Sequence, residues 1–277
     1  MLNYFKESFR RKIARRVFKE YPTIVNTFKI DANTSVKFAN WKNPLVVQKS
    51  IDVSAVIFFK KFIKEGDLVI DIGANIGHMT ITMSLANGRN GLTLAFDPNP
   101  HVLKILKQNC ELNKELTNII PLPFAITDTE EEFYYNSSEA SFNNGGISKE
   151  KDSRHGKFAL KEKIKGIILE KYLNQNHPQR LEKLTLIKID TEGYDKQIIK
   201  SISNLLVKHQ PVIISEYFKK LTPEERSEHF EMLSSMGYEL FYFDRWSDKA
   251  EIIPIKSPHD MMRWKHFDFF ATPRVMK

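Results

Sequence analysis

The sequence predicts an α/β fold built on a mostly parallel sheet, with the last strand antiparallel. From residue 68 onward, apolar runs alternate with helical patterns, which is typical of parallel strands joined by right-handed helical crossovers. Two successive apolar runs, residues 68–72 and 92–97, also end in or contain a carboxylate. Since the carboxyl ends of neighbouring parallel strands meet at one crevice, this pattern predicts a ligand site there.

The N-terminal part of the chain is expected to be an extension of this sheet. With 277 residues, 42% of them hydrophobic, the chain can bury the core of one α/β domain. We assign residues 1–66 to a basic helix and a cap region, with short strands over 24–30 and 36–38 and a helix over 50–64. Residues 67–277 are assigned to the main domain.

The first twenty residues predict a basic amphipathic helix. They carry seven lysines and arginines against two glutamates, so +5 of the formal net charge of +8 lies there. Phe5, Phe9, Ile13 and Val17 recur every fourth residue and align on one helix face. Two interpretations stay open: the helix lies on an anionic membrane surface, or it packs its apolar stripe on the main domain.

The composition also indicates the cellular compartment of the protein and the kinds of partner it can bind. Cys110 is the single cysteine, so the chain has no intramolecular disulfide, and a metal site built on several sulfur ligands is excluded. No signal-peptide pattern and no apolar span of about 18 residues is found. We therefore expect a cytoplasmic protein and assign no metal-ligating residues, although the sequence does not identify whether a metal is required. Nucleic acid is a poor partner because no basic, aromatic-interleaved stripe continues beyond the first helix.

The main domain is expected to follow the alternating pattern to its end. Strands are predicted over 68–72, 92–97, 119–124, 133–135, 164–169, 184–190, 211–217, 238–243 and 266–272, and helices over 77–87, 100–113, 170–174, 195–207 and 223–236. Residues 136–156 form a long polar stretch, which is either a functional lid or a disordered loop.

The turn after the first of these strands reads Asp-Ile-Gly-Ala-Asn-Ile-Gly. Gly73 and Gly77 permit positive φ and a close approach of the backbone to a ligand. Asn75 stands where a dinucleotide-binding fingerprint has its middle glycine, and nothing in the loop is basic enough to prefer a phosphate. A cationic ligand beside Asp71 fits better, and S-adenosylmethionine combines a sulfonium with an adenosine.

A second acid supports this interpretation of the loop. Asp97 follows Gly77 by 20 residues, the usual distance for a carboxylate that accepts hydrogen bonds from ribose hydroxyls. A nicotinamide-dependent oxidoreductase is the first alternative, although Asn75 argues against it. A non-catalytic binding module held at a membrane by residues 1–20 is the second.

A third strand end is also acidic. The run Leu-Ile-Lys-Ile over 186–189 leads into Asp190, Glu192 and Asp195. If this strand lies beside the first, Asp190 and Glu192 face Asp71 across the crevice, and closely spaced like charges raise a carboxylate pKa toward the range of a general base. We take Asp190 or Glu192 as the catalytic base, with His78 as a further candidate.

At this point the sequence resembles the FkbM-type methyltransferases, within the class I S-adenosylmethionine-dependent, Rossmann-like fold. The resemblance rests on Asp71-Ile-Gly-Ala-Asn-Ile-Gly77, Phe96-Asp-Pro-Asn-Pro100, residues 118–126, and Lys188-Ile-Asp-Thr-Glu-Gly193. It extends over residues 67–273, and it departs from the family where Asp97 replaces the usual Glu and where Tyr194 replaces a small residue.

The resemblance implies methyl transfer to an oxygen, often a hydroxyl of a sugar or another natural product. It also implies site roles. The cofactor-binding residues it gives are Asp71, Gly73, Ala74, Asn75 and Gly77 for the methionine end, Asp97 with Asn99 for the ribose, Ala125, Ile126 and Asp128 near the adenine, and Asp190 near the transferred methyl group. The expected partner is a small-molecule or glycan acceptor, and the sequence does not predict an oligomeric state. Asn143 and Asn144 in the polar stretch suit a sugar, and Trp246 and Trp264 are candidates to stack on one.

Overall fold

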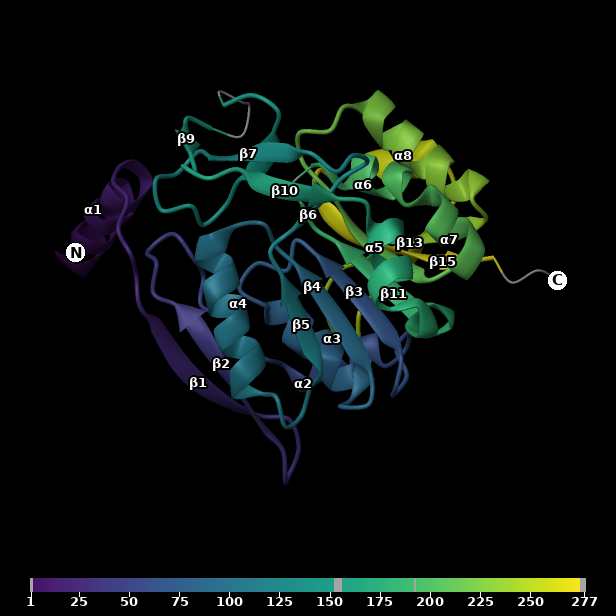
Figure 1. Cartoon of the computed structure of the whole chain (residues 1–277), viewed down its shortest axis with the longest axis horizontal. Coiled ribbons are helices and arrows are strands. Elements are labelled where there is room, and N and C mark those ends of the chain that lie inside the picture. The colour runs from purple at the N-terminus through teal and green to yellow at the C-terminus, as the bar shows by residue number, and fades with distance from the viewer. Residues whose placement is uncertain (1, 152–155, 192, 275–277) are drawn as a thin grey trace.

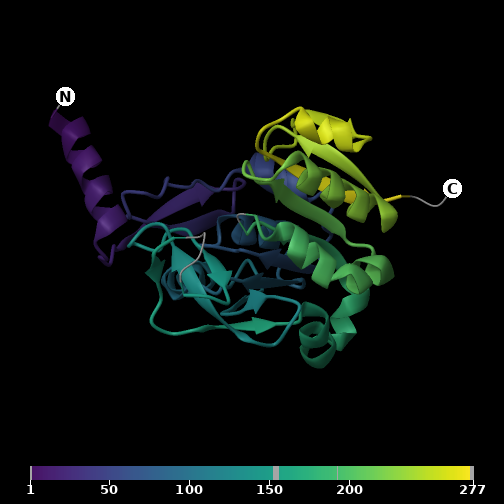
Figure 2. The same ribbon diagram turned by 90° about the horizontal axis from the view of Figure 1, so that it is seen from above.

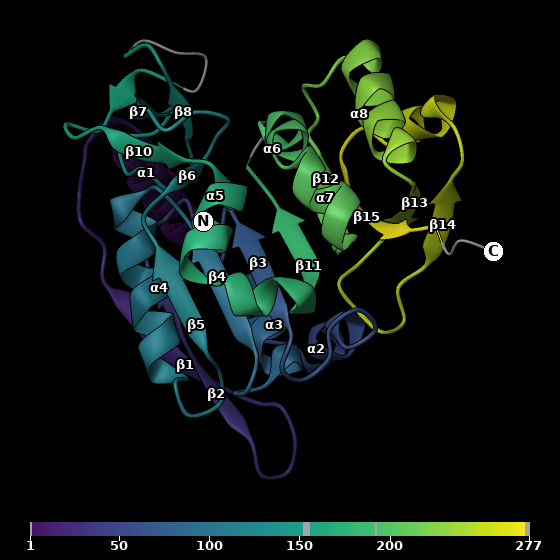
Figure 3. The ribbon, with the colours of Figure 1, turned by 45° about the vertical axis from the view of Figure 1, so that its right-hand side comes forward.

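The computed structural model of the chain describes residues 2–151, 156–191 and 193–274. Its centre is an eight-stranded sheet with the order β14-β13-β15-β12-β11-β3-β4-β5 (Figures 1 and 3). The parallel part consists of β5 (Ile119–Leu122), β4 (Leu92–Phe96), β3 (Leu68–Ile72), β11 (Leu184–Ile189) and β12 (Val212–Tyr217). The last strand, β15 (Phe267–Pro273), runs antiparallel between β12 and β13 (Tyr238–Phe243). The predicted mostly parallel sheet with an antiparallel last strand is therefore confirmed.

Helices cover both faces of this sheet, because the buried strands are apolar on both sides. Leu68, Ile70 and Ile72 of β3 pack in the cluster that includes α5 (Leu169–Asn176), α6 (Asp195–Ser201), α7 (Ser203–His209) and α8 (Pro223–Ser235). Val69 points to the other face and packs with α2 (Val53–Phe59) and α3 (His78–Asn87). Helix α4 (Pro100–Leu112) and the 3₁₀ turns η1 (Pro178–Lys183) and η2 (Pro258–Met262) complete the layers.

A smaller sheet lies beside the carboxyl ends of β4 and β5 (Figures 1 and 3). It contains β6 (Ala125–Ile126), β10 (Ile164–Ile167), β7 (Glu132–Ser137) and β8 (Gly146–Ser148), with β9 (Phe158–Ala159) paired to β7. The polar stretch 136–156 is thus partly folded as an arm of this sheet, which the sequence left open. Its residues 152–155 lie outside the described ranges.

Three other element predictions need correction. The helix expected over 50–64 is shorter, since α2 begins after its N-cap Asp52 and ends at Phe59. The helix expected over 195–207 is interrupted at Ile202 and forms α6 and α7. Strand β14 (Ile252–Ile255) was missed, because its Pro254 reads as a strand breaker, yet it is an edge strand, where proline is tolerated.

The N-terminal segment consists of α1 (Leu2–Arg16) and a hairpin of β1 (Thr23–Lys29) and β2 (Ser35–Trp41). Helix α4 holds β2 through buried Asn109, whose side chain accepts a hydrogen bond from the Ala39 N–H at 2.6 Å and donates to the Ala39 carbonyl at 3.2 Å and the Ile76 carbonyl at 2.8 Å. Helix α1 extends away from the body (Figure 2). Within the described ranges, no helix is long and apolar enough to cross a membrane.

Candidate active site

A cavity of about 480 Å³ opens at the carboxyl ends of the parallel strands. It is lined by the loops after β3 and β4, by the ends of β11, β12 and β15, and by residues 143–147 beside β8. Val46, Val47 and Lys49 contribute to its wall from the N-terminal segment. The cavity therefore lies where the fold predicts a ligand crevice.

The glycine loop has the strained geometry that its sequence predicts. Gly73 has φ +78°, and a Cβ there would lie 1.9 Å from the Asp190 carbonyl oxygen, so only glycine fits between the ends of β3 and β11. Gly77 has φ +91° at the start of α3, and Asn75 between them has φ +51°. The loop thus brings its backbone, with Ala74 and Asn75, against the cavity.

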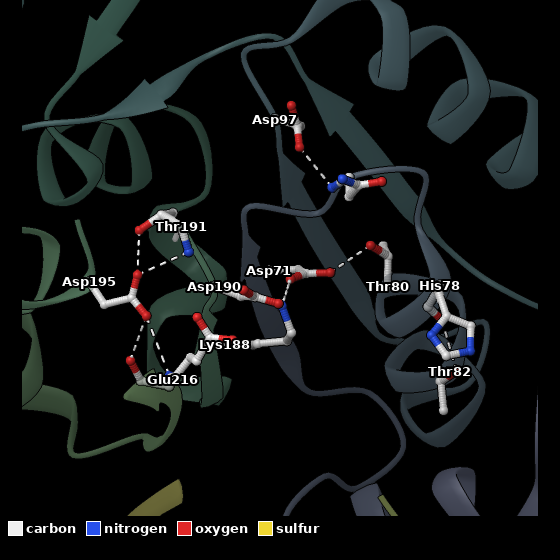
Figure 4. Close-up of polar contacts among 12 residues, drawn as sticks. Asp71, His78, Thr80, Thr82, Asp97, Lys188, Asp190, Thr191, Asp195 and Glu216 are labelled. Atoms are coloured by element: carbon white, nitrogen blue, oxygen red, sulfur yellow. Dashed lines mark hydrogen bonds and ion pairs between the residues drawn. The ribbon is translucent and has the colours of Figure 1, made fainter. Parts of the chain in front are cut away.

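Asp97, at the end of β4, lies beside this loop and lines the cavity, whereas its predicted contact with a ribose stays a prediction. The residue is 7% exposed, and its side chain accepts a hydrogen bond from the Asn75 N–H at 2.7 Å (Figure 4). A second oxygen accepts a hydrogen bond from the Asn99 N–H at 2.9 Å. Burial raises the pKa of Asp97 to about 7, although these two backbone hydrogen bonds lower it. The carboxylate is therefore fixed in place and ready to accept hydrogen bonds from a ligand.

Asp71 does not line the cavity, contrary to its expected contact with the ligand. Its side chain is fully buried, accepts a hydrogen bond from the Thr80 hydroxyl at 2.6 Å, and pairs with the Lys188 ammonium at 3.3 Å (Figure 4). Asp71 lies opposite Lys188 in the strand register and on the same sheet face. Its contact with the cavity is indirect, because Lys188 reaches the wall in its place.

Lys188 connects the buried Asp71 to the half-exposed Asp190. Its ammonium lies 3.3 Å from an oxygen of each of these two carboxylates. Burial alone would lower the pKa of Lys188, but the charges of Asp71 and Asp190 raise it above its ordinary value. Lys188 is therefore a permanent cation within the acidic wall.

Two further carboxylates that the sequence did not single out line the same cavity. Glu216 on β12 lies opposite Asp268 on β15 in the strand register. An oxygen of the Glu216 carboxylate also lies 2.7 Å from Nε2 of His266. Burial and the charge of Asp190 together raise the pKa of Asp268 to about 6, against the opposing effects of Lys188 and of a hydrogen bond from Trp246.

The sequence carried a signal for this group. Lys188, Glu216 and Asp268 are single charges inside otherwise apolar strands, where charged side chains are rarely buried without a role. Together with Asp71 they form a charged row across β3, β11, β12 and β15 on one sheet face. We call these four residues, with Asp190 at the end of β11, the charged row.

The predicted base cluster after β11 is only partly assembled. Asp190 lines the cavity, with 47% of its side chain exposed. Asp195 turns away from it and accepts hydrogen bonds from the Thr191 N–H at 2.9 Å and the Ser215 hydroxyl at 3.0 Å (Figure 4). Burial raises the pKa of Asp195 to about 6. Glu192 lies outside the described residues, so its role stays a prediction.

His78 lines the cavity near the start of α3, but its ring is engaged. Its Nε2 lies 2.9 Å from the Ser50 carbonyl oxygen, and burial lowers the pKa of this histidine. Its ring also packs edge-on to Phe38. The geometry favours a neutral imidazole that holds the backbone at Ser50 in place. The catalytic role of His78 stays a prediction.

Of the residues expected to contact the adenine and the ribose, some line the cavity and others do not. Ala125 and Ile126 line the cavity, with Phe124 beside them. Asp128 is exposed and is not among the residues that line the cavity. Asn99 is also absent from the wall, because its side chain caps α4 at the His101 N–H and donates to the Phe142 carbonyl at 2.7 Å. Asn99 thus positions the segment that leads to residues 143–147.

The two tryptophans have different positions. Trp246 lines the cavity and packs against Phe59, with ring centroids 5.4 Å apart. Trp264 stacks on Tyr242 at 4.0 Å and is not among the lining residues. Asn143 and Asn144 line the cavity on the side of β8. Among the described residues, no group of three His, Cys, Asp or Glu could hold a metal ion.

The charged and apolar groups that line the cavity suit S-adenosylmethionine. Carboxylates outnumber ammonium groups along the described wall, with Asp97, Asp190, Glu216 and Asp268 against Lys49 and Lys188. Such a wall favours a cationic sulfonium, and the glycine loop, Asp97 and the apolar surface at residues 124–126 fit the nucleoside part. Fold and site together define a class I S-adenosylmethionine-dependent methyltransferase.

Comparison with known proteins agrees with this class. A family model described as the methyltransferase FkbM domain matches residues 71–241, more than half of the chain. The chain therefore belongs to the FkbM methyltransferase family, whose members use S-adenosylmethionine. Family membership removes the support for the nicotinamide-dependent alternative.

Two curated relatives and one solved structure are similar to the chain. It is 25% identical over 152 residues to hexuronic acid methyltransferase AglP of Haloferax volcanii, which is 54% of this chain and 56% of that protein. The chain thus spans little more than half of AglP. It is 25% identical over 146 residues to a probable cobalt-precorrin-6B C(15)-methyltransferase of Saccharolobus solfataricus, covering 50% of this chain and 71% of that protein. The structure of M. jannaschii TYW2 in complex with AdoMet aligns with a TM-score of 0.42 and 15% identity, over 94% of this chain and 90% of TYW2.

Proposed function

We propose that this methyltransferase acts on oxygen and that its acceptor is a hydroxyl group of a sugar or glycan. The observation that carries the proposal is the set of carboxylates Asp190, Glu216 and Asp268 in the wall beside the glycine loop. Carboxylates bind the hydroxyl donors of a polyol, and an aromatic ring such as that of Trp246 offers an apolar surface for a pyranose. The name of the Haloferax relative, a hexuronic acid methyltransferase, supports the same acceptor class.

The cofactor and the protein have separate tasks in this mechanism. When bound, S-adenosylmethionine supplies an electrophilic methyl group. The glycine loop and Asp97 hold the nucleoside and amino-acid parts, and the acidic wall orients the acceptor hydroxyl. Holding two reactants in the productive geometry is worth about 7–11 kcal/mol of the barrier. Most of the rate enhancement is therefore assigned to binding geometry.

Asp268 is the general base in this proposal. It lines the cavity, it is held by Trp246, and its pKa of about 6 lets it be ionised at neutral pH while remaining basic enough to accept a proton. Asp190 is the second candidate, with one oxygen engaged by Lys188 at 3.3 Å. The base takes the proton of the acceptor hydroxyl and leaves an oxygen of greater nucleophilicity.

A methyl-transfer assay with a panel of acceptors tests the proposal. The purified chain is incubated with radiolabelled S-adenosylmethionine and with neutral glycosides, hexuronic acid glycosides, amines and catechols, and the products are analysed by mass spectrometry. We expect label on a sugar hydroxyl. Label on amine or carbon alone would contradict O-methylation, and binding of S-adenosylhomocysteine without any turnover would favour the non-catalytic module.

The base is tested with Asp268→Asn, and Asp128→Asn serves as the control because Asp128 is exposed outside the cavity. We expect Asp268→Asn to lower kcat by about 10²- to 10⁴-fold while S-adenosylhomocysteine still binds. Below pH 6 the wild-type kcat should fall tenfold per pH unit, and this limb should be absent in the variant. If Asp190→Asn removes the limb and Asp268→Asn does not, Asp190 is the base.

A further inference from the structure

We propose that α1, with the turn to residue 18, is a membrane-binding element that docks on an anionic lipid surface. Its apolar side chains are turned outward. Phe9 is 65% exposed, Ile13 is 38% exposed and Val17 is 57% exposed, and Phe18 in the following turn is 49% exposed. Large exposed apolar side chains in one patch usually mark an interaction surface.

The helix contacts the body of the protein with its other side. Ala14 is fully buried, and the Arg15 carbonyl accepts a hydrogen bond from the Ala140 N–H at 3.1 Å. At about 100° per residue, Ala14 lies about 120° around the helix from the midpoint of Phe9 and Ile13. The apolar stripe is therefore not the face that packs on the domain, which was one of the two interpretations that the sequence allowed.

The charges around the apolar stripe of α1 indicate which kind of partner binds it. The first twenty residues carry seven cations and two acids, and Lys12 and Arg16 lie close to the stripe on the helical wheel. An anionic bilayer complements both properties, because the rings enter the interface while the ammonium and guanidinium groups meet lipid phosphates. A second copy would bring two equally cationic segments together, and nucleic acid would leave the phenyl rings in water.

The same helix is connected to the loop that enters the cavity. The Phe18 ring lies 5.2 Å from the His101 ring and 6.4 Å from the Phe142 ring, and the next residues, 143–147, line the cavity. Docking of α1 would therefore hold this loop at the lipid surface. The acceptor would then be presented from, or close to, a membrane, which rests on the proposed function above.

Vesicle sedimentation with the full chain tests the docking without using activity. We expect binding to vesicles of phosphatidylcholine with phosphatidylglycerol, little binding to phosphatidylcholine alone, and release at high salt. Phe9→Ser should weaken binding by about tenfold or more, and Lys12→Glu by on the order of twentyfold. Val207→Ser is the matched control, since Val207 is 56% exposed on α7.

Three results would overturn this proposal. The first is the absence of sedimentation with anionic vesicles. The second is wild-type binding by Phe9→Ser, and the third is a dimer in light scattering that Phe9→Ser converts to a monomer. Because the readout is binding, a failure of lipid docking leaves the methyl-transfer result unaffected, and the reverse also holds.

Discussion

Replacing Lys188 by Met should destabilise the fold severely, because this residue neutralises a carboxylate with no access to water. Lys188 is 4% exposed and Asp71 is 0% exposed, and their charged atoms lie 3.3 Å apart. Methionine leaves the buried Asp71 carboxyl group without its countercharge and with only the Thr80 hydroxyl as a side-chain donor. Removing one partner of a buried ion pair costs about 3–5 kcal/mol. That is a large part of the roughly 5–15 kcal/mol that stabilises a typical domain.

Urea unfolding followed by circular dichroism measures this loss. The control is Lys171→Met, the same substitution in an ion pair with Glu130 whose side chains are 48% and 42% exposed, and it should cost less than about 1 kcal/mol. The double variant Asp71→Asn with Lys188→Met should recover most of the stability, because no unpaired buried charge remains. A loss below about 1 kcal/mol for Lys188→Met alone would refute the reasoning.

Two further predictions concern cofactor binding, measured by calorimetry with S-adenosylhomocysteine. Gly73→Ala should abolish binding because its Cβ would meet the Asp190 carbonyl oxygen at 1.9 Å. The control Gly237→Ala, at φ +88° in open space, should lower the free energy of unfolding by only about 1 kcal/mol and bind the ligand normally. Equal affinities of the two variants would contradict the close approach of Gly73 to Asp190. Affinity should rise from about pH 5 to about pH 8 as Asp97, with a pKa of about 7, ionises to accept hydroxyl hydrogen bonds, and Asp97→Asn should remove this dependence. Because burial raises that pKa, the contribution of Asp97 to the stability of the ligand-free protein should fall as pH rises from about 4 through 7.

The glycine loop and the parallel strands could be predicted because their signals are local. Gly73 and Gly77 are required by positive φ within the loop itself, and the spacing to Asp97 follows from one strand-helix-strand unit. Asn99 illustrates a signal that was present and was interpreted as a ligand contact. Asn followed by Pro100 is also a helix N-cap followed by the N1 residue, which is the role the side chain has.

The role of Asp71 could not be predicted in the same way. Its direction depends on the alternation of β3, and its burial depends on a partner more than a hundred residues later, Lys188. Asp268 likewise reaches the cavity beside Glu216 only because β15 pairs with β12. A charge inside an apolar strand is visible at each position, but which distant residues come together is not.

The hydrogen bonds of Asn109 give the hairpin an importance beyond that of a cover. Asn109 has no exposed surface, and its amide is divided between Ala39 on β2 and Ile76 in the glycine loop. A chain shortened to begin at residue 67 would lose the hydrogen bonds to Ala39 and would expose to water the apolar side chains of α4, such as Val102 and Ile105, that pack in one cluster with β2. It would also lose Lys49 and Val47 from the cavity wall. A minimal version of this enzyme must therefore retain β2 and the segment after it, even though the family match begins at residue 71.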